Sequence, residues 1–460
     1  MIDHIVFQNA KVVHIVGIGG TGVSGLARLL QSEGKTVRGS DMKRNAITEQ
    51  LERAGISVFC PHGEENISTD TDLVIYSLAI PVDNPELHKA EKLRIPAVTY
   101  PQALGFLMHE KRGIAIAGTH GKTTTSALVV HILRQSGIAP GFVIGGEIIG
   151  LGNSGAGNGP FLVAEACEYR RSFLNLEPEI AVITTIEEDH LDFYKDITEI
   201  TGAFKEFASH VKGTVIGSAH DDRIAQIFST LGKPTLTFGL GNGELSASQI
   251  QYQDKGNSFV CNFEGRHLGE ISSPLCGYHN ILNCLASIAV ALILKIPWES
   301  ISAAVKNFPG VGRRCEIIGE YSGIMIVDDY GHHPTEIVAT LRGLRQKFPG
   351  RRIVAVFQPH QYSRTRFLLR DFAASFQFAD EVIVPDIYFV RDSEAEKKLI
   401  NSEILVREIR GNGTNARYIK TFEEIVSYLE ENSKNGDLVL TIGAGPVNEV
   451  AMKLKEALSR

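Results

Sequence analysis

Residues 114–125 read Ile-Ala-Ile-Ala-Gly-Thr-His-Gly-Lys-Thr-Thr-Thr. The apolar run 114–117 predicts a buried strand, and the residues after Lys122 follow a helical pattern. In the loop between them, backbone amides can cradle phosphate oxygens, Lys122 can reach the β- and γ-phosphates, and the Thr123 hydroxyl can bind Mg²⁺. The loop departs from the common phosphate-binding pattern because Gly118 and Gly121 stand closer together than that pattern requires. A chance Gly-Lys-Thr is the weaker alternative, since both flanks fit a nucleotide site.

Short apolar runs alternate with longer amphipathic stretches along most of the chain, which predicts α/β layers with mostly parallel sheets. We expect strands in three groups: 12–16, 36–39 and 73–76; 114–117, 161–164 and 181–184; and 324–327, 353–357, 381–384 and 438–442. Charged or Gly/Pro-rich seams near 109–112 and 309–314 separate the groups. They predict three domains, 1–110, 111–314 and 315–460, with Rossmann-like outer domains and a phosphate-loop domain between them. The glycine-rich, polar segment 217–273 permits no assignment.

Composition excludes several classes of protein. The 460 residues are 43% hydrophobic and 22% charged, with a formal net charge of -7 and no basic block, so neither nucleic acid nor an anionic membrane is an expected partner. The six cysteines form no Cys-x-x-Cys pair, which is typical of reduced thiols. The first residues lack the features of a signal peptide, and the apolar stretch 284–294 is too short to span a bilayer. A cytoplasmic protein is expected.

A second glycine-rich turn, Gly17-Ile-Gly19-Gly20-Thr21-Gly22, follows the strand 12–16. Such a turn brings backbone N–H groups and a helix N-terminus to a diphosphate. Asp41, at the end of the next strand, can accept a ribose hydroxyl. From the pattern alone NAD is the first candidate ligand, and an ordinary turn is the alternative.

Acids and histidines follow other predicted strands. Glu165 ends the run 161–164, and His190 lies shortly after 181–184. Because ligands bind beyond the carboxyl ends of parallel strands, both residues should lie near the phosphates held by Lys122 and can bind magnesium. Taken alone, each is better interpreted as a solvated loop acid or a hydrogen-bonded histidine, and the magnesium interpretation becomes equally good only beside the phosphate loop. Polar clusters at 328–336 and 358–365 also follow strands and predict a shared cleft.

Taken together, these motifs resemble the Mur ligases in order and spacing from about residue 12 to 445. The resemblance rests on Gly118-Thr-His-Gly-Lys-Thr-Thr124, Glu188-Asp-His190, Gly277-Tyr-His-Asn-Ile-Leu-Asn283, Arg313-Arg314, Asp329-Tyr-Gly-His-His-Pro334 and Gln358-Pro-His360. Within the family, it implies ATP-dependent ligation of L-alanine to UDP-N-acetylmuramate through an acyl phosphate, in peptidoglycan precursor synthesis. It also implies that the turn at Gly17 holds the UDP-sugar and not NAD, and that the C-terminal domain closes over the amino acid.

The resemblance assigns roles to individual residues. Catalytic roles are implied for Lys122, His333 as the base for the amine, and Arg364. ATP contacts are implied for Gly118, Thr119, His120, Gly121, Lys122, Thr123, Thr124, His279, Asn280, Asn283, Arg314 and Asp329. Substrate contacts are implied for Gly17, Gly19, Gly20, Thr21, Gly22, Asp41, Ser77, His360, Tyr362 and Arg364. Magnesium ligands are implied to be Thr123, Glu165 and His190.

Three positions depart from the family pattern. Cys167 stands for an aspartate, Cys315 for the aromatic residue after the arginine pair, and Gln361 for an arginine that bears on the choice among alanine, serine and glycine. A lysine near Lys205 is carbamylated in several related ligases, but we expect Lys205 to be an ordinary exposed lysine.

Alternative functions stay open at this point. They are a ligase that attaches a ready-made tripeptide to the same UDP-sugar, a nicotinamide-dependent oxidoreductase built on the Gly17 turn, and a regulatory ATPase without ligase chemistry. A monomer or a homodimer is expected.

Overall fold

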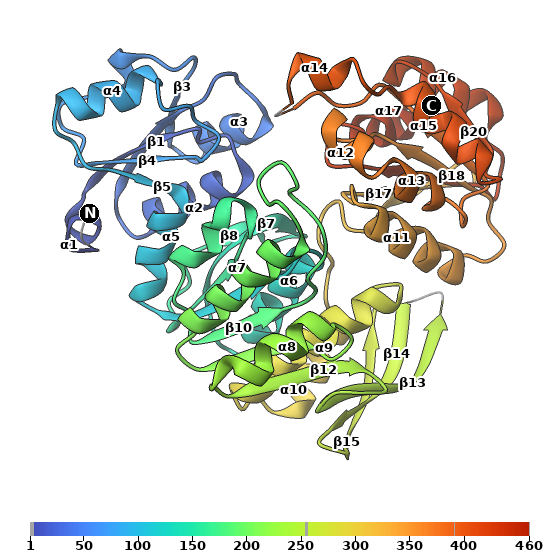
Figure 1. Ribbon diagram of the computed structural model, residues 1–460, viewed down its shortest axis with the longest axis horizontal. Helices are drawn as coiled ribbons and strands as arrows, with labels where there is room; N and C mark the ends of the chain where they lie inside the picture. Colours follow the sequence, from blue (N-terminus) through green and yellow to red (C-terminus); the bar gives the residue numbers. More distant parts are fainter. Residues whose placement is uncertain (1–3, 254–255, 391, 460) are drawn as a thin grey trace. The chain divides into compact units, whose positions relative to one another are not determined.

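The computed structural model describes residues 4–253, 256–390 and 392–459. These residues form two compact units. The first contains the chain up to Ala247 together with 262–268 and 283–305, and the second contains 248–261, 269–282 and the chain from Lys306 onward. Figure 1 shows helices beside most of the strands. The α/β class with mostly parallel sheets is confirmed.

The first unit begins with a five-stranded parallel sheet in the order β3-β2-β1-β4-β5. Its strands are β1 (Val12–Val16), β2 (Thr36–Ser40), β3 (Ser57–Phe59), β4 (Leu73–Tyr76) and β5 (Ala97–Thr99). The helices are α1 (His4–Asn9), α2 (Thr21–Ser32), α3 (Ala46–Arg53), η1 (Glu64–Asn66), α4 (Pro85–Lys92) and α5 (Tyr100–His109). Capping boxes at Asn45 and Thr99 fix the starts of α3 and α5 by satisfying otherwise orphan N–H groups.

The second sheet has ten strands, of which seven in this unit run β12-β11-β10-β6-β9-β7-β8 and are parallel except for the β7–β8 pair. Its strands are β6 (Arg112–Ala117), β7 (Gly141–Ile148), β8 (Gly152–Gly155), β9 (Phe161–Glu165), β10 (Ile180–Ile183), β11 (Thr214–Ser218) and β12 (Thr235–Leu240). The connecting helices are α6 (Lys122–Gln135), η2 (Tyr169–Asn175), α7 (Ile197–His210) and α8 (Asp222–Leu231). Because β10, β6 and β9 are parallel neighbours, their carboxyl ends meet at one edge.

The segment that resisted assignment from sequence is rich in strands. After β12 come β13 (Leu245–Gln253), β14 (Gly256–Phe263) and β15 (Arg266–Ser273), followed by α9 (Tyr278–Ile293) and α10 (Trp298–Lys306). The start of β13 pairs in parallel with β12, from Phe238–Leu245 to Leu240–Ala247.

The second unit contains a six-stranded sheet in the order β16-β17-β21-β18-β19-β20. Its strands are β16 (Glu316–Tyr321), β17 (Ile324–Asp329), β18 (Ile353–Phe357), β19 (Glu381–Val384), β20 (Ala416–Tyr418) and β21 (Leu438–Ile442), and only β16 is antiparallel to its neighbour. The helices are α11 (Pro334–Lys347), α12 (Tyr362–Phe367), α13 (Leu369–Ala374), α14 (Glu394–Lys397), α15 (Ser402–Gly411), α16 (Phe422–Asn432) and α17 (Asn448–Leu458).

Alternating residues of its central strands enter two different cores. Leu438, Leu440 and Ile442 pack on one face, whereas Val439 packs on the other. Burial on both faces explains why these strands read as continuous apolar runs in the sequence.

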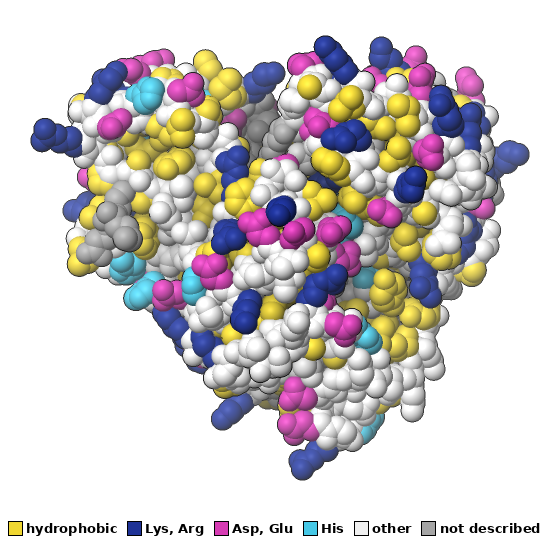
Figure 2. Space-filling view, in the orientation of Figure 1, with side chains coloured by type: hydrophobic (Ala, Val, Ile, Leu, Met, Phe, Trp, Pro, Cys, Tyr) yellow, Lys and Arg dark blue, Asp and Glu magenta, His cyan; other side chains and the backbone are white. Residues whose placement is uncertain are grey.

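Two features of the structure concern the expectation that the chain binds neither nucleic acid nor a membrane: the distribution of surface charge and the length of the helices. On the face drawn in Figure 2, basic and acidic side chains are interspersed. Across the described residues, every helix falls short of the length and apolar character that crossing a bilayer requires.

Candidate active site

The phosphate loop connects β6 to α6 as predicted, and its glycines are sterically required. Gly118 and Gly121 have φ angles of 128° and 79°. A Cβ atom on Gly118 would lie 1.9 Å from Thr184 Oγ1, and one on Gly121 would lie 2.4 Å from Asn283 Oδ1. The turn therefore brings glycine backbone without side chains to the N-terminus of α6, where the helix dipole and the N–H groups of a first helical turn favour an anion.

Hydrogen bonds join this loop to the segment after β10. Thr119 N–H donates to the Thr185 carbonyl at 2.8 Å, and Glu187 N–H donates to Thr119 Oγ1 at 2.8 Å. The Thr184 hydroxyl donates to the His120 carbonyl, and His120 Nε2 lies 3.3 Å from a Glu187 carboxylate oxygen. These bonds fix the loop at the edge where the strands end.

Lys122 folds back over its own loop. Its ammonium donates to the carbonyls of Gly118 at 2.5 Å and Thr119 at 3.1 Å, and to both carboxylate oxygens of Glu168 at 3.2 and 3.0 Å. Glu168 is buried, and its own carbonyl accepts a hydrogen bond from the Tyr194 hydroxyl at 2.6 Å. Burial is the largest single effect and would lower the pKa of Lys122, but the charge and hydrogen bonds of Glu168, together with the nearby Cys167 and Glu165, outweigh burial and raise that pKa. Sequence reasoning gave Glu168 no role, because only the fold brings it to Lys122.

The three expected magnesium ligands follow three neighbouring strands. Thr123 lies in the first turn of α6 after β6, Glu165 is the last residue of β9, and His190 follows β10. A Glu165 carboxylate oxygen accepts the Gly145 N–H at 2.6 Å. His190 has a φ of 54°, and its ring centroid lies 4.8 Å from that of Tyr169. A hydroxyl, a carboxylate and an imidazole beside a phosphate loop form a donor set that fits a hard divalent cation.

The predicted nucleotide residues on α9 divide between the two units. Asn283 reaches the phosphate-loop helix, where its Oδ1 accepts a hydrogen bond from Thr125 Oγ1 at 3.2 Å. His279 and Asn280 lie in the second unit, and Asn280 Nδ2 donates to the Cys276 carbonyl at 2.8 Å. Thr124, also predicted, is buried on α6.

The N-terminal glycine turn connects β1 to α2. Gly17 has a φ of 81°, and a Cβ atom there would lie 3.0 Å from the Cβ of Ser77. The Asp41 carboxylate accepts the N–H groups of Gly19 and Met42, each at 2.8 Å. Asp41 therefore supports the turn directly, a role that the sequence pattern did not indicate.

The rest of this turn contacts neighbouring elements of the first unit. The Thr21 carbonyl accepts a hydrogen bond from Asn153 at 2.9 Å, and a Cβ atom on Gly22 would lie 2.8 Å from the Tyr100 hydroxyl. The position of Gly20 leaves room for a side chain, because the nearest atom to a Cβ there is 3.7 Å away. Arg170, which sequence reasoning passed over, donates to the Leu78 carbonyl at 2.9 Å.

In the second unit, Asp329 ends β17 and is buried. Its carboxylate accepts the N–H groups of Cys315 and Gly331, both at 2.7 Å. Burial raises its pKa to about 6, although the nearby charge of Arg314 and these two hydrogen bonds oppose the shift. The guanidinium groups of Arg313 and Arg314 lie 5.1 and 5.2 Å from the Tyr330 ring centroid.

His333 caps α11, which changes its expected chemistry. Its Nδ1 accepts the Thr335 N–H at 3.3 Å, and Glu336 completes the capping box. Because Nδ1 accepts this hydrogen bond, the neutral ring carries its proton on Nε2. In this tautomer Nε2 is a donor and cannot accept a proton from the amine. The geometry favours a hydrogen-bond donor over the base that we expected.

The predicted amino-acid residues surround the start of α12. His360 pairs with Tyr388 in an isolated parallel bridge, and their ring centroids are 5.6 Å apart. Gln361 is 6% exposed with a φ of 75°. Tyr362 N–H donates to Asp392 Oδ2 at 2.5 Å. Arg364 lies in the last turn of this helix.

Lys205 lies exposed on α7, as expected for an ordinary surface lysine.

Comparisons with known proteins match the whole length of the chain. The family models are the Mur ligase family catalytic domain over 12–112, the Mur ligase middle domain over 116–291 and the Mur ligase glutamate ligase domain over 313–445. The UDP-N-acetylmuramate–L-alanine ligase of Caldanaerobacter subterraneus is 43% identical over 98% of both chains. The enzyme of the same name from Desulfitobacterium hafniense is 44% identical over 96% of this chain and 99% of its own.

Solved structures agree with these matches. The crystal structure of UDP-N-acetylmuramate–alanine ligase from Thermotoga maritima is 29% identical, with a TM-score of 0.84 over 98% of this chain and 99% of that one. A murein peptide ligase from Psychrobacter arcticus is 25% identical, with a TM-score of 0.74 over the same shares. The chain therefore belongs to the Mur ligase family and is an ATP-dependent ligase.

Proposed function

We propose that this enzyme joins L-alanine to UDP-N-acetylmuramate in peptidoglycan precursor synthesis. The observation that carries the proposal is the identity of 43 and 44%, over nearly the whole chain, to two ligases named for that reaction. The tripeptide-adding alternative has weaker support, because the murein peptide ligase is 25% identical. The proposed domains are 1–110 for the UDP-sugar, 111–314 for ATP and 315–460 for the amino acid. We place the reaction in the cytoplasm, where ATP and UDP-sugars are made.

The reaction needs an activated carboxylate, because a free carboxylate is a poor electrophile. The carboxylate of the UDP-sugar attacks the γ-phosphorus of ATP, which gives an acyl phosphate and releases ADP. The amine of L-alanine then attacks the acyl carbon, the amide bond forms, and phosphate leaves. The phosphoryl transfer is largely a matter of positioning and charge stabilisation.

The phosphate loop supplies much of that stabilisation. In the proposed complex, the N–H groups of the first turn of α6 hold the phosphate oxygens, and Lys122 leaves Glu168 to bind the transferring phosphoryl group. His120, Thr124 and Asn283 support the loop, while His279, Asn280, Arg314 and Asp329 serve the nucleotide. Thr123, Glu165 and His190 would hold Mg²⁺, which neutralises phosphate charge when bound.

The amino acid is proposed to bind beside α12. Arg364 would hold its carboxylate through a charge-assisted fork, and His360 and Tyr362 would line the site. His333 would orient the amine through its Nε2–H. The turn from Gly17 to Gly22, with Ser77 beside it, would hold the UDP moiety.

A phosphate-release assay tests the proposal. Purified enzyme is given ATP and Mg²⁺ with UDP-N-acetylmuramate and L-alanine, L-serine, glycine or the tripeptide, and each substrate is omitted in turn. We expect release that requires both the UDP-sugar and L-alanine. A preference for the tripeptide would favour the recycling reaction.

Binding measurements separate the proposal from an oxidoreductase. Titration calorimetry should detect UDP-N-acetylmuramate and no NAD. Tight NAD binding without a response to the UDP-sugar would overturn the proposal. Light scattering on the same preparation decides between a monomer and a homodimer.

A further inference from the structure

Two consecutive arginines, Arg170 and Arg171, follow the buried Glu168 in the segment η2. Their φ angles are 50° and 55°, in the left-handed region that residues with side chains rarely adopt. The Arg171 N–H donates to the Glu168 carbonyl at 2.9 Å and helps to close this turn. Such a conformation persists only where the surrounding structure imposes it. The fold therefore fixes the direction in which each arginine side chain leaves the backbone.

The two arginines differ in their partners. Arg171 forms ion pairs with two acids of α7, Glu199 at 3.3 Å and Glu206 at 3.5 Å. Arg170 is exposed, and among the described residues its one hydrogen bond goes to the Leu78 carbonyl, at 2.9 Å. A guanidinium has five N–H donors and a permanent positive charge. Arg170 therefore keeps most of its donors for solvent or for a ligand.

Tyr169 holds the guanidinium of Arg170 from a second direction. The guanidinium lies 5.5 Å from the centroid of the Tyr169 ring. That ring is itself fixed, because its hydroxyl donates to Asp192 at 3.2 Å and its edge-to-face contact with Phe193 has a centroid distance of 6.2 Å. An arginine that is oriented in advance loses less side-chain entropy when it binds an anion.

On one side, Arg170 reaches the proposed UDP-sugar turn. Leu78, which accepts its hydrogen bond, is the neighbour of Ser77 in the chain. A Cβ atom on Gly17, the first glycine of that turn, would lie 3.0 Å from the Cβ of Ser77. These residues all belong to the first unit. The charge of Arg170 is therefore held within two residues of the turn.

On the other side, the same segment reaches the proposed ATP site. The ring centroid of Tyr169 lies 4.8 Å from that of His190, a proposed magnesium ligand. Glu168 forms the ion pair with Lys122 at 3.0 Å. Arg170 thus belongs to a segment that contacts both the turn for the UDP-sugar and the residues for the transferring phosphoryl group.

We propose that Arg170 is a further substrate-binding residue, whose guanidinium binds an anionic group of the UDP-sugar. This inference rests on the proposed function. UDP-N-acetylmuramate has two such groups, the diphosphate and the carboxylate that ATP activates. Both accept paired, charge-assisted hydrogen bonds from an arginine fork. Arg170 supplies the fork at the place where the UDP-sugar has to extend from its turn toward the phosphate loop.

Titration calorimetry on the full-length enzyme tests the proposal and identifies the group. UDP-N-acetylglucosamine has the diphosphate but lacks the carboxylate of UDP-N-acetylmuramate. Arg170→Ala should raise the Kd for UDP-N-acetylmuramate roughly tenfold to a hundredfold, as expected for a lost hydrogen bond between charged groups. An equal rise for both ligands assigns Arg170 to the diphosphate, and a rise for UDP-N-acetylmuramate alone assigns it to the carboxylate. An unchanged Kd for UDP-N-acetylmuramate would overturn the proposal.

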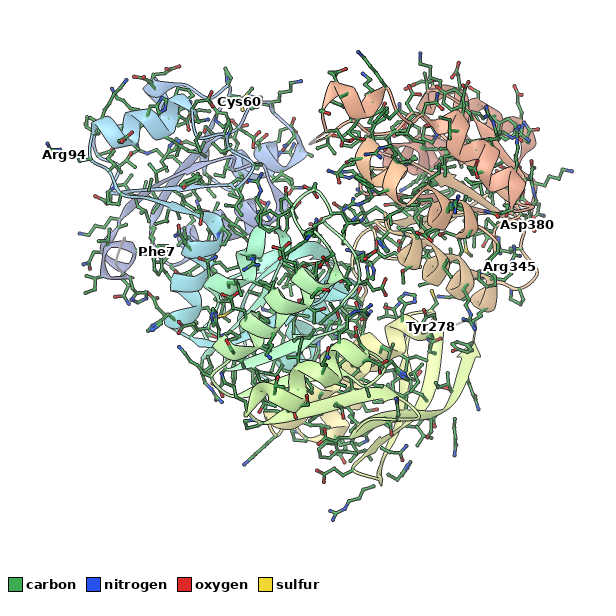
Figure 3. All side chains as sticks on the ribbon, in the orientation of Figure 1. Phe7, Cys60, Arg94, Tyr278, Arg345 and Asp380 are labelled. Atoms are coloured by element: carbon green, nitrogen blue, oxygen red, sulfur yellow. The ribbon has the colours of Figure 1, made fainter. Side chains whose placement is uncertain are left out.

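Two other arginines of the first unit are matched controls. Arg171→Ala changes the neighbouring residue, which has the same backbone conformation but is paired with α7. Arg94 also has a positive φ, 57°, and Figure 3 shows its side chain at the edge of the unit, pointing away from it. Both alanine variants should keep the wild-type Kd. Arg170→Lys should recover only part of the lost affinity, because lysine has the charge without the fork.

The same measurements separate a binding role from a structural one. In Arg170→Ala the Kd for ATP should stay at the wild-type value, because the folded phosphate loop does not need this arginine. An equal loss of UDP-sugar affinity in Arg171→Ala would show that the conformation of the segment is responsible, and it would overturn the proposal. A wild-type enzyme that does not bind UDP-N-acetylmuramate would overturn the proposed function as well. Normal wild-type binding that Arg170→Ala leaves unchanged would overturn this inference alone.

Discussion

The Glu86 carboxylate joins β1, β2 and η1 of the first unit. It is 0% exposed. It lies 3.1 Å from His14 Nε2 on β1, and it accepts hydrogen bonds from Ser40 Oγ at 2.5 Å and Asn66 Nδ2 at 2.7 Å. Burial alone would raise its pKa, but the hydrogen bonds from His14, Asn66 and Ser40 together outweigh burial and lower the pKa from 4.5 to about 2.

This shift gives the size and sign of a stability effect. A pKa lowered by about 2.5 units corresponds to roughly 3 kcal/mol, at about 1.4 kcal/mol per unit. A carboxyl group with a lowered folded-state pKa stabilises the fold above its unfolded pKa, and that contribution is lost as the pH falls toward the folded value. For Glu86, the loss should take place between pH 4.5 and about 2. Glu86→Gln should therefore lower stability by about 3 kcal/mol at neutral pH and by progressively less below pH 4.5.

The assay must report on this region alone, because a chain with two compact units need not unfold in one step. Hydrogen exchange of the peptides that contain β1 and β3, followed along a urea series at several pH values, meets that requirement. Glu64→Gln is the control: Glu64 is paired with Lys92 at the surface, so its loss should change the midpoint little. A gap between wild type and Glu86→Gln that stays constant from pH 7 to pH 3 would refute the reasoning, because it would show that the charge of Glu86 contributes nothing.

Three further predictions concern the proposed active site. Lys122→Ala should abolish phosphate release while circular dichroism stays unchanged, whereas Lys205→Ala, at an exposed lysine, should retain the activity. Gly121→Ala should abolish ATP binding in calorimetry, because the new Cβ would lie 2.4 Å from Asn283 Oδ1 at a φ of 79°; retained binding would mean that the loop relaxes. Arg364→Ala should raise the KM for L-alanine at least about tenfold, from the roughly 1.5–3 kcal/mol of a hydrogen bond to a charged group. The control is Arg366→Ala, because Arg366 lies on the same helix as Arg364 and is hydrogen-bonded to Glu396. This variant should keep a KM for L-alanine near the wild-type value.

The parallel strands were the most predictable part of the fold. The runs 12–16, 73–76, 353–357, 381–384 and 438–442 match β1, β4, β18, β19 and β21 residue for residue. These strands are buried along most of their length, so their sequences are mainly apolar, although His14, Glu381 and Thr441 are buried polar exceptions. Strands β13 to β15 were not predicted, because their exposed and buried positions alternate irregularly and polar residues are frequent in them.

Functional residues could be predicted only where they come directly after a strand in the sequence. The phosphate loop satisfies that condition, since Gly118 to Thr123 lie between one strand and one helix. Glu168 does not, because its contact with Lys122 joins residues 46 positions apart. The capping role of His333 depends on a backbone conformation, which residue type alone does not determine.

The Lys122–Glu168 ion pair affects whether Lys122 contributes more to the affinity for ATP or to the rate of the chemical step. The Lys122 ammonium donates to two loop carbonyls and one buried carboxylate. In the proposed complex, binding the phosphates exchanges one charge-assisted hydrogen bond for another, so we expect Lys122 to add little net affinity for ATP. The exchange becomes favourable only as charge spreads over the transferring phosphoryl group, because Lys122 then meets more charge than Glu168 offers. Loss of Lys122 should accordingly reduce kcat far more than it raises the Kd for ATP, and an equal loss in both would show that the ion pair does not set the ground state.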